Sequence, residues 1–593
     1  MNRTSVRAEL NLKKPTVPII IQNINTDTNS TFADINNLKN VVEDYNKFLT
    51  LEHNINILDE SLDIIDEDYK FSYFSNNLSN DDCTTNNSIT INLQDKYNVP
   101  ALSLDLGDNS FLHSLKYDYL RDNVSISSQT ITPSIAKEHI NIDVSEDNIN
   151  SIVITFTKTR FPRMFTRLQQ IYFGIVYDFF DKDIVSCNVK EFVHPISTEL
   201  RPNTCEVSIY SEDEDFDLIN SEYFQYLKKD LDLRIYAKYN DTEYLFGIYY
   251  LDNWNVDNPK EIKFNAISQL DKLNNITCYD GWYCDPKSEN TYTIFKKLFD
   301  ESDNLTIDYE LSEELKQSKL MGIIPLDNYK NVVHLIAFCS NSAVKQTRDG
   351  KLSIYKYSST NAKTISPDVI FEGVKVTKNE LPTKVNLKYY SYDSNAMTLV
   401  SDLKNVLSVY IEAGTDKLII LENPSSAVYY KPPSWSDYSS SPEFITTPHS
   451  FVLRNPSETG IYRFKIVPYN IETSTYIHSL SNNLDQSENV IDINNSNLLY
   501  ATGGNNVAGG GEGTPIQGND TVFLNNLKNY YSNCNYTVEF DFLNDGTIQT
   551  GDYVSVVDES GNVFKGHIVE QNINLGGGII SHAKLVGRLA QWL

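Results

Sequence analysis

An acidic run is the first place in this sequence where residue types suggest metal chemistry. It reads EDEDFD, from Glu212 to Asp217. An EF-hand loop that began at Asp213 would require Gly at its sixth position and Glu at its twelfth. Those positions hold Leu218 and Phe224. The spacing therefore excludes an EF-hand and favours a solvated acidic loop.

The cysteines and histidines form no recognisable metal or nucleophile motif. No CxxC occurs, and Cys278 and Cys284 have no histidine at zinc-ligand spacing. His334 and Cys339 lie on different faces of a predicted helix, which disfavours a Cys–His nucleophile. HExxH, GxSxG and the P-loop G-K-S/T are also absent. We therefore predict no catalytic residue, no metal site and no cofactor.

One basic and aromatic loop could contact sugars. Arg160, Phe161, Pro162 and Arg163 follow a long predicted strand, SIVITFTKT. An aromatic ring flanked by cations can take part in glycan binding, so Arg160, Phe161 and Arg163 are candidate glycan contacts. The alternative is a structural spacer with a solvated arginine loop, and the sequence favours that alternative.

The overall charge limits the possible partners. Lys and Arg number 50 against 79 Asp and Glu, so the formal net charge is −29. This balance disfavours binding to nucleic-acid phosphates, which need cationic neutralisation, and docking on an anionic membrane. The apolar run near the N-terminus is too short for a signal peptide or a membrane span. Few, dispersed cysteines indicate reduced thiols and synthesis in a cytoplasm.

Short strands dominate the centre of the chain, from Asp183 to Ala266. Apolar and polar residues alternate, as at Cys205, Val207 and Ile209, and turn signals separate the strands. This pattern predicts a small antiparallel barrel.

The remaining segments predict a mainly β protein with a small α/β portion. Helical spacing occurs in TYTIFKKLFDES and in DNYKNVVHLIAFC, where Asp327 or Asn328 is the expected N-cap. Asp349-Gly350 predicts a hairpin turn. The N-terminal half is expected to contain a lead-in segment at 1–50, with a helix over FADINNLKNVVEDYNKFL, a jelly-roll sandwich at 51–176 and a first barrel at 177–275. A small α/β domain is expected at 276–357. A discontinuous second barrel is expected at 358–395 and 519–593, interrupted at 396–518 by an inserted β domain with a Gly-rich connector.

Several stretches resemble one protein family. The order STELxxNxxxVxI, an acidic loop, a short helix, a strand and then GIYYLDNW resembles the first barrel of the baseplate-hub and tail-associated proteins of long-tailed phages. GDYVSV and GHIVEQNIN are similar to the C-terminal barrel strands of that family. SIVITFTKT followed by RLQQIYFG resembles a galactose-binding-like sandwich of the discoidin type.

The resemblance implies a structural virion protein rather than an enzyme. It implies a homotrimeric ring that closes the tail tube at the tail tip or baseplate of a phage or phage-like bacteriocin. The implied partners are the tail-tube or distal-tail protein, the tape-measure protein, and fibre or receptor-binding proteins. No membrane and no specific nucleic acid is expected as a partner.

Two alternatives stay open from the sequence. The first is a tail adhesin whose N-terminal sandwich binds host cell-wall glycan. The second, less favoured, is a tail-associated wall hydrolase, because a glycosidase needs only two well-placed carboxylates and the chain has 79 acidic residues.

Overall fold

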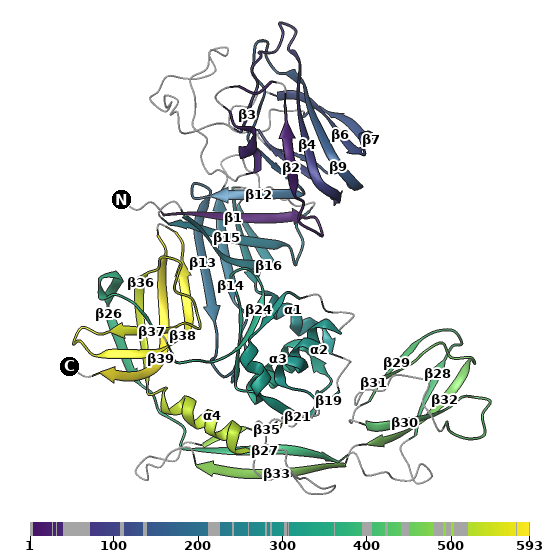
Figure 1. The fold of residues 1–593 in the computed structure, drawn as a ribbon, viewed down its shortest axis with the longest axis vertical. Helices are drawn as coiled ribbons and strands as arrows, with labels where there is room; N and C mark the ends of the chain where they lie inside the picture. The colour runs from purple at the N-terminus through teal and green to yellow at the C-terminus, as the bar shows by residue number, and fades with distance from the viewer. Residues whose placement is uncertain are drawn as a thin grey trace.

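The computed structural model shows a mainly β chain in which helices are confined to short segments (Figure 1). The predicted fold class is therefore confirmed. The structure describes residues 4–26, 28–30, 33–39, 72–106, 112–133, 139–210, 226–239, 242–258, 260–278, 282–284, 288–301, 305, 307–360, 362–393, 406–421, 425–439, 450–468, 470–479, 490–493, 500–502, 520–576 and 578–591. The acidic run at 212–217 and the Gly-rich connector lie outside these residues.

A sheet of thirteen strands forms the centre of the molecule (Figure 1). Its order is β12 (Ile175–Phe180), β1 (Thr4–Lys13), β15 (Asp232–Tyr239), β16 (Thr242–Asn258), β17 (Glu261–Ile267), β14 (Thr204–Tyr210), β13 (Ile184–Phe192), β38 (Val563–Asn574), β39 (Ile580–Gln591), β36 (Tyr536–Leu543) and β26 (Ile370–Lys378). β37 (Tyr553–Val557) pairs with β38, and β25 (Lys363–Thr364) pairs with β37. Within the described residues the hydrogen-bonded path runs from β12 to β26 without returning to its start.

This sheet covers two separate hydrophobic cores. Alternate side chains of β1 and β13 to β17 fill the first core, among them Leu10, Val189, Val207, Leu233 and Phe264. Side chains of the C-terminal strands fill the second core, among them Val538, Phe540, Val554, Ile568 and Leu585. The two barrels that the sequence predicts are thus two parts of one sheet, joined where β13 pairs with β38.

The N-terminal strand corrects the expected lead-in segment. β1 lies between β12 and β15, so that Arg7 is opposite both Phe180 and Tyr236. Its residues Val6, Ala8, Leu10 and Leu12 are buried in the first core. The alternation is visible in the sequence, but the partner strand is distant along the chain, so only the tertiary structure shows where β1 belongs. In the predicted lead-in helix, the described part is a 3-10 helix, Ile35–Lys39.

The N-terminal sandwich has a five-stranded sheet and a three-stranded sheet around one core. The larger sheet has the order β2 (Ile21–Asn25), β4 (Thr84–Val99), β9 (Glu146–Thr159), β6 (Leu112–Arg121) and β7 (Val124–Ile131). The smaller sheet has the order β11 (Gln170–Tyr172), β5 (Leu102–Asp105) and β8 (His139–Ile142), and β10 (Arg167–Leu168) pairs with β3 (Tyr73–Phe74).

A small α/β unit packs beside the central sheet. Its helices are α1 (Gln269–Lys272), α2 (Thr291–Asp300), α3 (Tyr329–Cys339) and two short 3-10 segments, Leu273–Asn275 and Glu313–Gln317. Another 3-10 segment, Pro367–Val369, precedes β26, and its Val369 packs against the second core of the central sheet. Its strands are β18 (Thr277–Cys278), β19 (Tyr283–Cys284), β20 (Tyr309–Leu311), β21 (Lys319–Ile323), β22 (Asp327–Asn328), β23 (Ser342–Gln346) and β24 (Leu352–Lys356). The Asn328 side chain accepts a hydrogen bond from the Asn331 backbone N–H at 2.8 Å, which confirms the predicted N-cap of α3. The later helix α4 (Asp520–Ser532) adds Leu527 and Tyr530 to the same core.

A long arm leads from this unit to a second small sandwich (Figure 1). In the arm, β27 (Lys384–Asp393) pairs with β33 (Asn470–Ser479) and β34 (Val490–Ile493), and β35 (Tyr500–Thr502) pairs with β21. The prediction that residues up to 395 belong to the second barrel is therefore wrong for β27. The small sandwich has one sheet of β28 (Val406–Ile411), β32 (Gly460–Pro468) and β30 (Ser425–Lys431), and another of β29 (Lys417–Ile420) and β31 (Ser450–Leu453).

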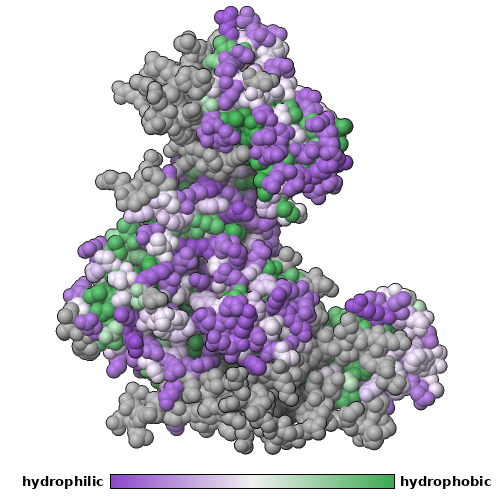
Figure 2. All heavy atoms as spheres, viewed as in Figure 1, coloured by the Kyte–Doolittle hydropathy of each residue, from purple (hydrophilic) through white to green (hydrophobic). Residues whose placement is uncertain are grey.

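The coloured residues in Figure 2 are mostly hydrophilic, with hydrophobic residues in scattered groups. This fits the large excess of acidic residues in the composition. Among the described helices, none has the length and apolar character needed to cross a membrane.

Candidate functional site

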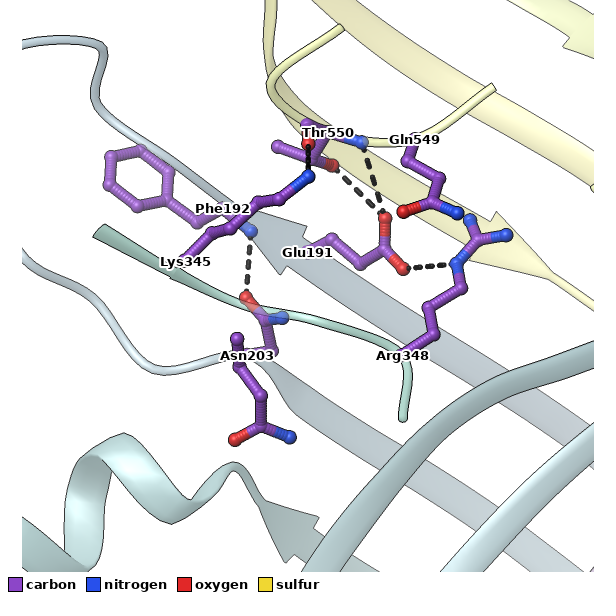
Figure 3. Close-up of a pocket in the computed structure, with 8 residues that line it drawn as sticks. Glu191, Phe192, Asn203, Lys345, Arg348, Gln549 and Thr550 are labelled. Atoms are coloured by element: carbon purple, nitrogen blue, oxygen red, sulfur yellow. Dashed lines mark hydrogen bonds and ion pairs between the residues drawn. The ribbon is translucent and has the colours of Figure 1, made fainter. Parts of the chain in front are cut away.

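A small polar cavity lies where the two parts of the central sheet meet the α/β unit (Figure 3). It is lined by Glu191, Phe192, Asn203, Lys345, Gln346, Arg348, Gln549 and Thr550. The centre of a water-sized sphere can move through only about 10 Å³ of it, which is room for about one water molecule. The cavity is therefore too small for a substrate.

An ion pair between Glu191 and Arg348 forms the middle of this junction. β13 points Cys187, Val189 and Glu191 to the same buried side, so Glu191 is the polar end of an apolar row. Arg348 comes from the turn between β23 and β24, and its Nε donates to Glu191 Oε1 at 2.9 Å. The two side chains are only 9% and 7% exposed, for Arg348 and Glu191. The pair thus joins the first part of the sheet to the α/β unit.

The loop before β37 binds both members of the pair. Glu191 Oε2 accepts a hydrogen bond from Thr550 Oγ1 at 3.1 Å. Arg348 Nη1 donates to the Gly546 carbonyl at 2.9 Å, and its guanidinium lies 4.3 Å from the centre of the Phe246 ring. Because a buried charge is costly unless it is paired and hydrogen-bonded, this satisfied network favours one arrangement of the three segments.

Two further side chains from β23 extend the junction. Gln346 accepts from the Gln269 backbone N–H at 2.7 Å and donates to the Ile248 carbonyl at 2.8 Å. Lys345 Nζ donates to the Thr550 carbonyl at 3.4 Å, and burial lowers the pKa of this amine from its ordinary value. The junction therefore joins segments from four parts of the chain through buried hydrogen bonds and one ion pair.

The junction residues were not predicted as a site. One signal was present in the sequence: Glu191 interrupts the apolar alternation of a strand that otherwise reads as barrel interior. A charge at an inward position implies a buried partner, but nothing in the sequence identifies Arg348 as that partner.

The three candidate glycan contacts lie in one bend after β9, but they do not form a shared platform. Arg163 Nε pairs with Asp81 Oδ1 at 2.9 Å at the surface. Arg160 Nη2 donates to the Pro133 carbonyl at 3.4 Å. Phe161 is 49% exposed. Both arginines thus have protein partners, while Phe161 is about half exposed, and glycan contact stays a prediction.

The structure places no metal-binding group of three or more His, Cys, Asp or Glu side chains among the residues it describes. All seven cysteines are free, and six of them are buried.

A buried histidine lies next to the junction. The His567 ring packs against Tyr357 and Tyr553, with ring centres 4.2 and 4.9 Å away, and its Nδ1 lies 3.0 Å from the Gly551 carbonyl oxygen. Burial lowers the pKa of His567 from 6.5 to about 4, although the nearby Asp552 opposes this shift. The folded chain therefore holds this ring neutral at pH values where the unfolded chain protonates it.

We expect acid to destabilise the fold through His567. The lowered pKa means that its contribution is fully present above about pH 6.5 and is lost as pH falls towards about 4. At pH 4.5 the free energy of unfolding should be lower by about 2–3 kcal/mol, since one pKa unit corresponds to about 1.4 kcal/mol. Urea unfolding at pH 7 and pH 4.5 should show a smaller acid loss for His567→Gln than for the natural chain. His582→Gln, at an exposed histidine that pairs with Asp541, is the control. An equal acid loss in the natural chain and His567→Gln would contradict the expectation.

Comparisons with known proteins found similarity only at the level of solved structures. No family model matches the sequence, and no curated protein matches it. Similar solved structures include the 43 kDa tail protein of prophage MuSo2 from Shewanella oneidensis, with 9% identity, a TM-score of 0.37 and coverage of 70% of this chain and 94% of that chain. They also include the prophage tail protein gp18 from Listeria monocytogenes EGD-e, with 10% identity, a TM-score of 0.37 and coverage of 70% and 92%.

Proposed function

We propose that this chain is a structural protein of a phage or phage-like bacteriocin tail, and that three copies form a ring that closes the tail tube at its tip. The observation that carries the proposal is the continuous central sheet. β13 pairs with β38 from Asn188 opposite Asn574 to Phe192 opposite Glu570, so one hydrogen-bonded sheet runs past both cores. Such a sheet transmits force between the two parts without a flexible linker.

The junction supports the same role. The Glu191–Arg348 pair and its hydrogen bonds to the loop before β37 fix the angle between the two parts of the sheet. A ring that bears the load of a tail needs fixed angles, whereas an enzyme needs an open cleft. In a trimer, the two cores of each chain would give six similar units, which suits contact with a six-fold tube.

The ends of the central sheet support assembly into a ring. β12, β25 and β26 are its edge strands in the described residues. On β26, Phe371 is 42% exposed and Val376 is 37% exposed. Edge strands with accessible apolar side chains invite pairing with another chain, and a ring would cover them. The tail-tube or distal-tail protein, the tape-measure protein and the fibre or receptor-binding proteins are the further partners that we propose.

Labelling of whole particles tests this proposal. A gold-tagged antibody against the N-terminal sandwich should bind at the tip of isolated tails in the electron microscope, and three-fold averaging of the tip should show three copies. Mass photometry of the purified chain should show a species of about three times 67.7 kDa. Label along the shaft, or a tip without three-fold density, would contradict the proposal.

A second candidate function rests on the exposed Phe161 ring. If the N-terminal sandwich is an adhesin, Phe161→Ala combined with Arg163→Ala should abolish binding of the chain to host wall glycan. The double variant should keep the natural melting temperature, because both side chains are at the surface. Undiminished binding would remove this loop from consideration.

A further inference from the structure

The small sandwich at the end of the arm has an unusual distribution of charge. Its three-stranded sheet consists of β28, β32 and β30, whose sequences are VLSVYI, GIYRFKIVP and SSAVYYK. These strands contain three cationic residues and no acidic residue, in a chain that has 79 acidic residues and a net charge of −29. The sheet is therefore a local exception to the charge of the whole protein.

The strand register gathers the cations and aromatic rings on the outer side of this sheet. Tyr410 is opposite Ile461, Arg463 is opposite Lys431, and Lys465 is opposite Tyr429. We call these six residues the cationic face. The residues between them, such as Tyr430, Tyr462 and Phe464, point inward and are buried in the sandwich core.

The cationic face is exposed at Tyr410, Ile461 and Arg463, and its other three residues are half-buried. Tyr410 is 62% exposed and Ile461 is 57% exposed. Arg463 is also exposed, and within the described residues it forms no ion pair. The Lys465 amine lies 4.7 Å from the centre of the Tyr438 ring, which brings a third tyrosine to the rim. The side chains on this face are those that recur at binding hot spots, namely tyrosine and arginine.

The size of the face indicates a slender ligand. Three strands spaced by about 4.8 Å, over about four residues of about 3.4 Å each, span an area of roughly 200 Å². A stable protein partner covers about 800 Å² on each side. A protein surface is therefore disfavoured, and a single polymer chain fits the face.

The charge indicates which polymer fits. Three cations neutralise few phosphates, and nucleic acid, with a charge on every residue, would be repelled by a chain with a net charge of −29. A polymer with rings to stack on tyrosine and with only occasional negative groups matches the face better. We propose that the cationic face binds an anionic glycan in which charged groups are sparse, either carboxylates or phosphates. This inference does not depend on the proposed tail function.

Binding of two polysaccharides to the full-length chain tests the inference. The probes are hyaluronan, with a carboxylate on every second sugar, and a capsular polysaccharide with one phosphodiester in each repeat. Biolayer interferometry should detect saturable binding of at least one, and the better probe shows which anionic group is preferred. Arg463→Glu should weaken that binding by more than tenfold, and Tyr410→Ala should weaken it by about tenfold, as expected for hot-spot side chains.

A matched variant separates a specific face from general charge. Lys417→Glu makes the same charge change on β29, in the opposite sheet of the same sandwich, at an exposed position. It should change binding by less than twofold. Absence of binding to both polysaccharides, or an equal loss in Lys417→Glu and Arg463→Glu, would overturn the inference. Tighter binding of a single-stranded oligonucleotide or of poly-glutamate would also overturn it.

Discussion

Removal of residues 1–13 is expected to make the chain insoluble or to leave its first core molten. This stretch contains β1, which pairs with β12 on one side and with β15 on the other. Without it, β12 loses its only partner among the described strands and β15 loses one of its two partners, and exposed strand edges template aggregation. The effect should be far larger than that of an ordinary N-terminal truncation.

The side chains of β1 explain the size of this effect. Val6, Leu10 and Leu12 are each at most 4% exposed, and burial of such a side chain is worth about 1.5–3 kcal/mol. Arg7 Nη1 also donates to Asp178 Oδ1 at 2.7 Å. Burial raises the pKa of Asp178, which Arg7 opposes. Loss of Arg7 would leave a buried carboxylate unpaired, at about 3–5 kcal/mol. The sum is comparable to the about 5–15 kcal/mol that stabilises a domain.

Expression of two truncated chains checks this prediction. A chain that starts at Lys14 should be found in inclusion bodies or should unfold without a cooperative transition in calorimetry. A chain that starts at Thr4 is the control, and it should unfold like the full chain. A soluble chain from Lys14 with an unchanged melting temperature would show that β1 contributes little to the sheet.

Arg348→Ala should produce the second large effect, because it leaves Glu191 charged and buried without its partner. Breaking a buried ion pair from one side costs about 3–5 kcal/mol, which corresponds to a melting temperature lowered by roughly 10 °C for a cooperative unit of this kind. The double variant Glu191→Gln with Arg348→Met should recover much of the lost melting temperature, because it removes both charges and keeps side chains of similar volume.

An exposed ion pair provides the control for the junction. Arg201 pairs with Glu199, and the two side chains are 54% and 47% exposed. Arg201→Ala should lower the free energy of unfolding by less than about 1 kcal/mol. Equal decreases in melting temperature for Arg348→Ala and Arg201→Ala would show that the buried ion pair does not stabilise the junction. They would also contradict a fixed angle between the two parts of the sheet.

Local elements could be predicted from the sequence because their signals lie within a few residues. The alternation in Thr204–Tyr210 predicts a strand, and a strand is observed there. Helical spacing and the cap at Asn328 predict α3, and the Asp349-Gly350 turn predicts the β23–β24 hairpin. Each of these depends on backbone propensity or on one local hydrogen bond.

The candidate site could not be predicted in the same way. Its members come from β13, the β23–β24 turn and the loop before β37, and the charge at Glu191 shows only that some partner must be buried nearby. The cationic face was also missed, because Tyr410, Arg463 and Lys431 lie on three strands whose register is set by the folded sandwich.

The sequence by itself determined the mainly β class, the positions of most strands and helices in the described residues, and the acidic charge of the chain. Only the tertiary structure decided strand partners. β1 pairs with β15, and β27 pairs with β33 rather than with strands of the predicted second barrel. β13 pairs with β38, so the two predicted barrels form one sheet. The physical reason is that alternation specifies which side of a strand is buried, whereas many apolar faces in one chain compete as partners. Packing of whole cores and satisfaction of buried charges, such as Glu191 with Arg348, select among them.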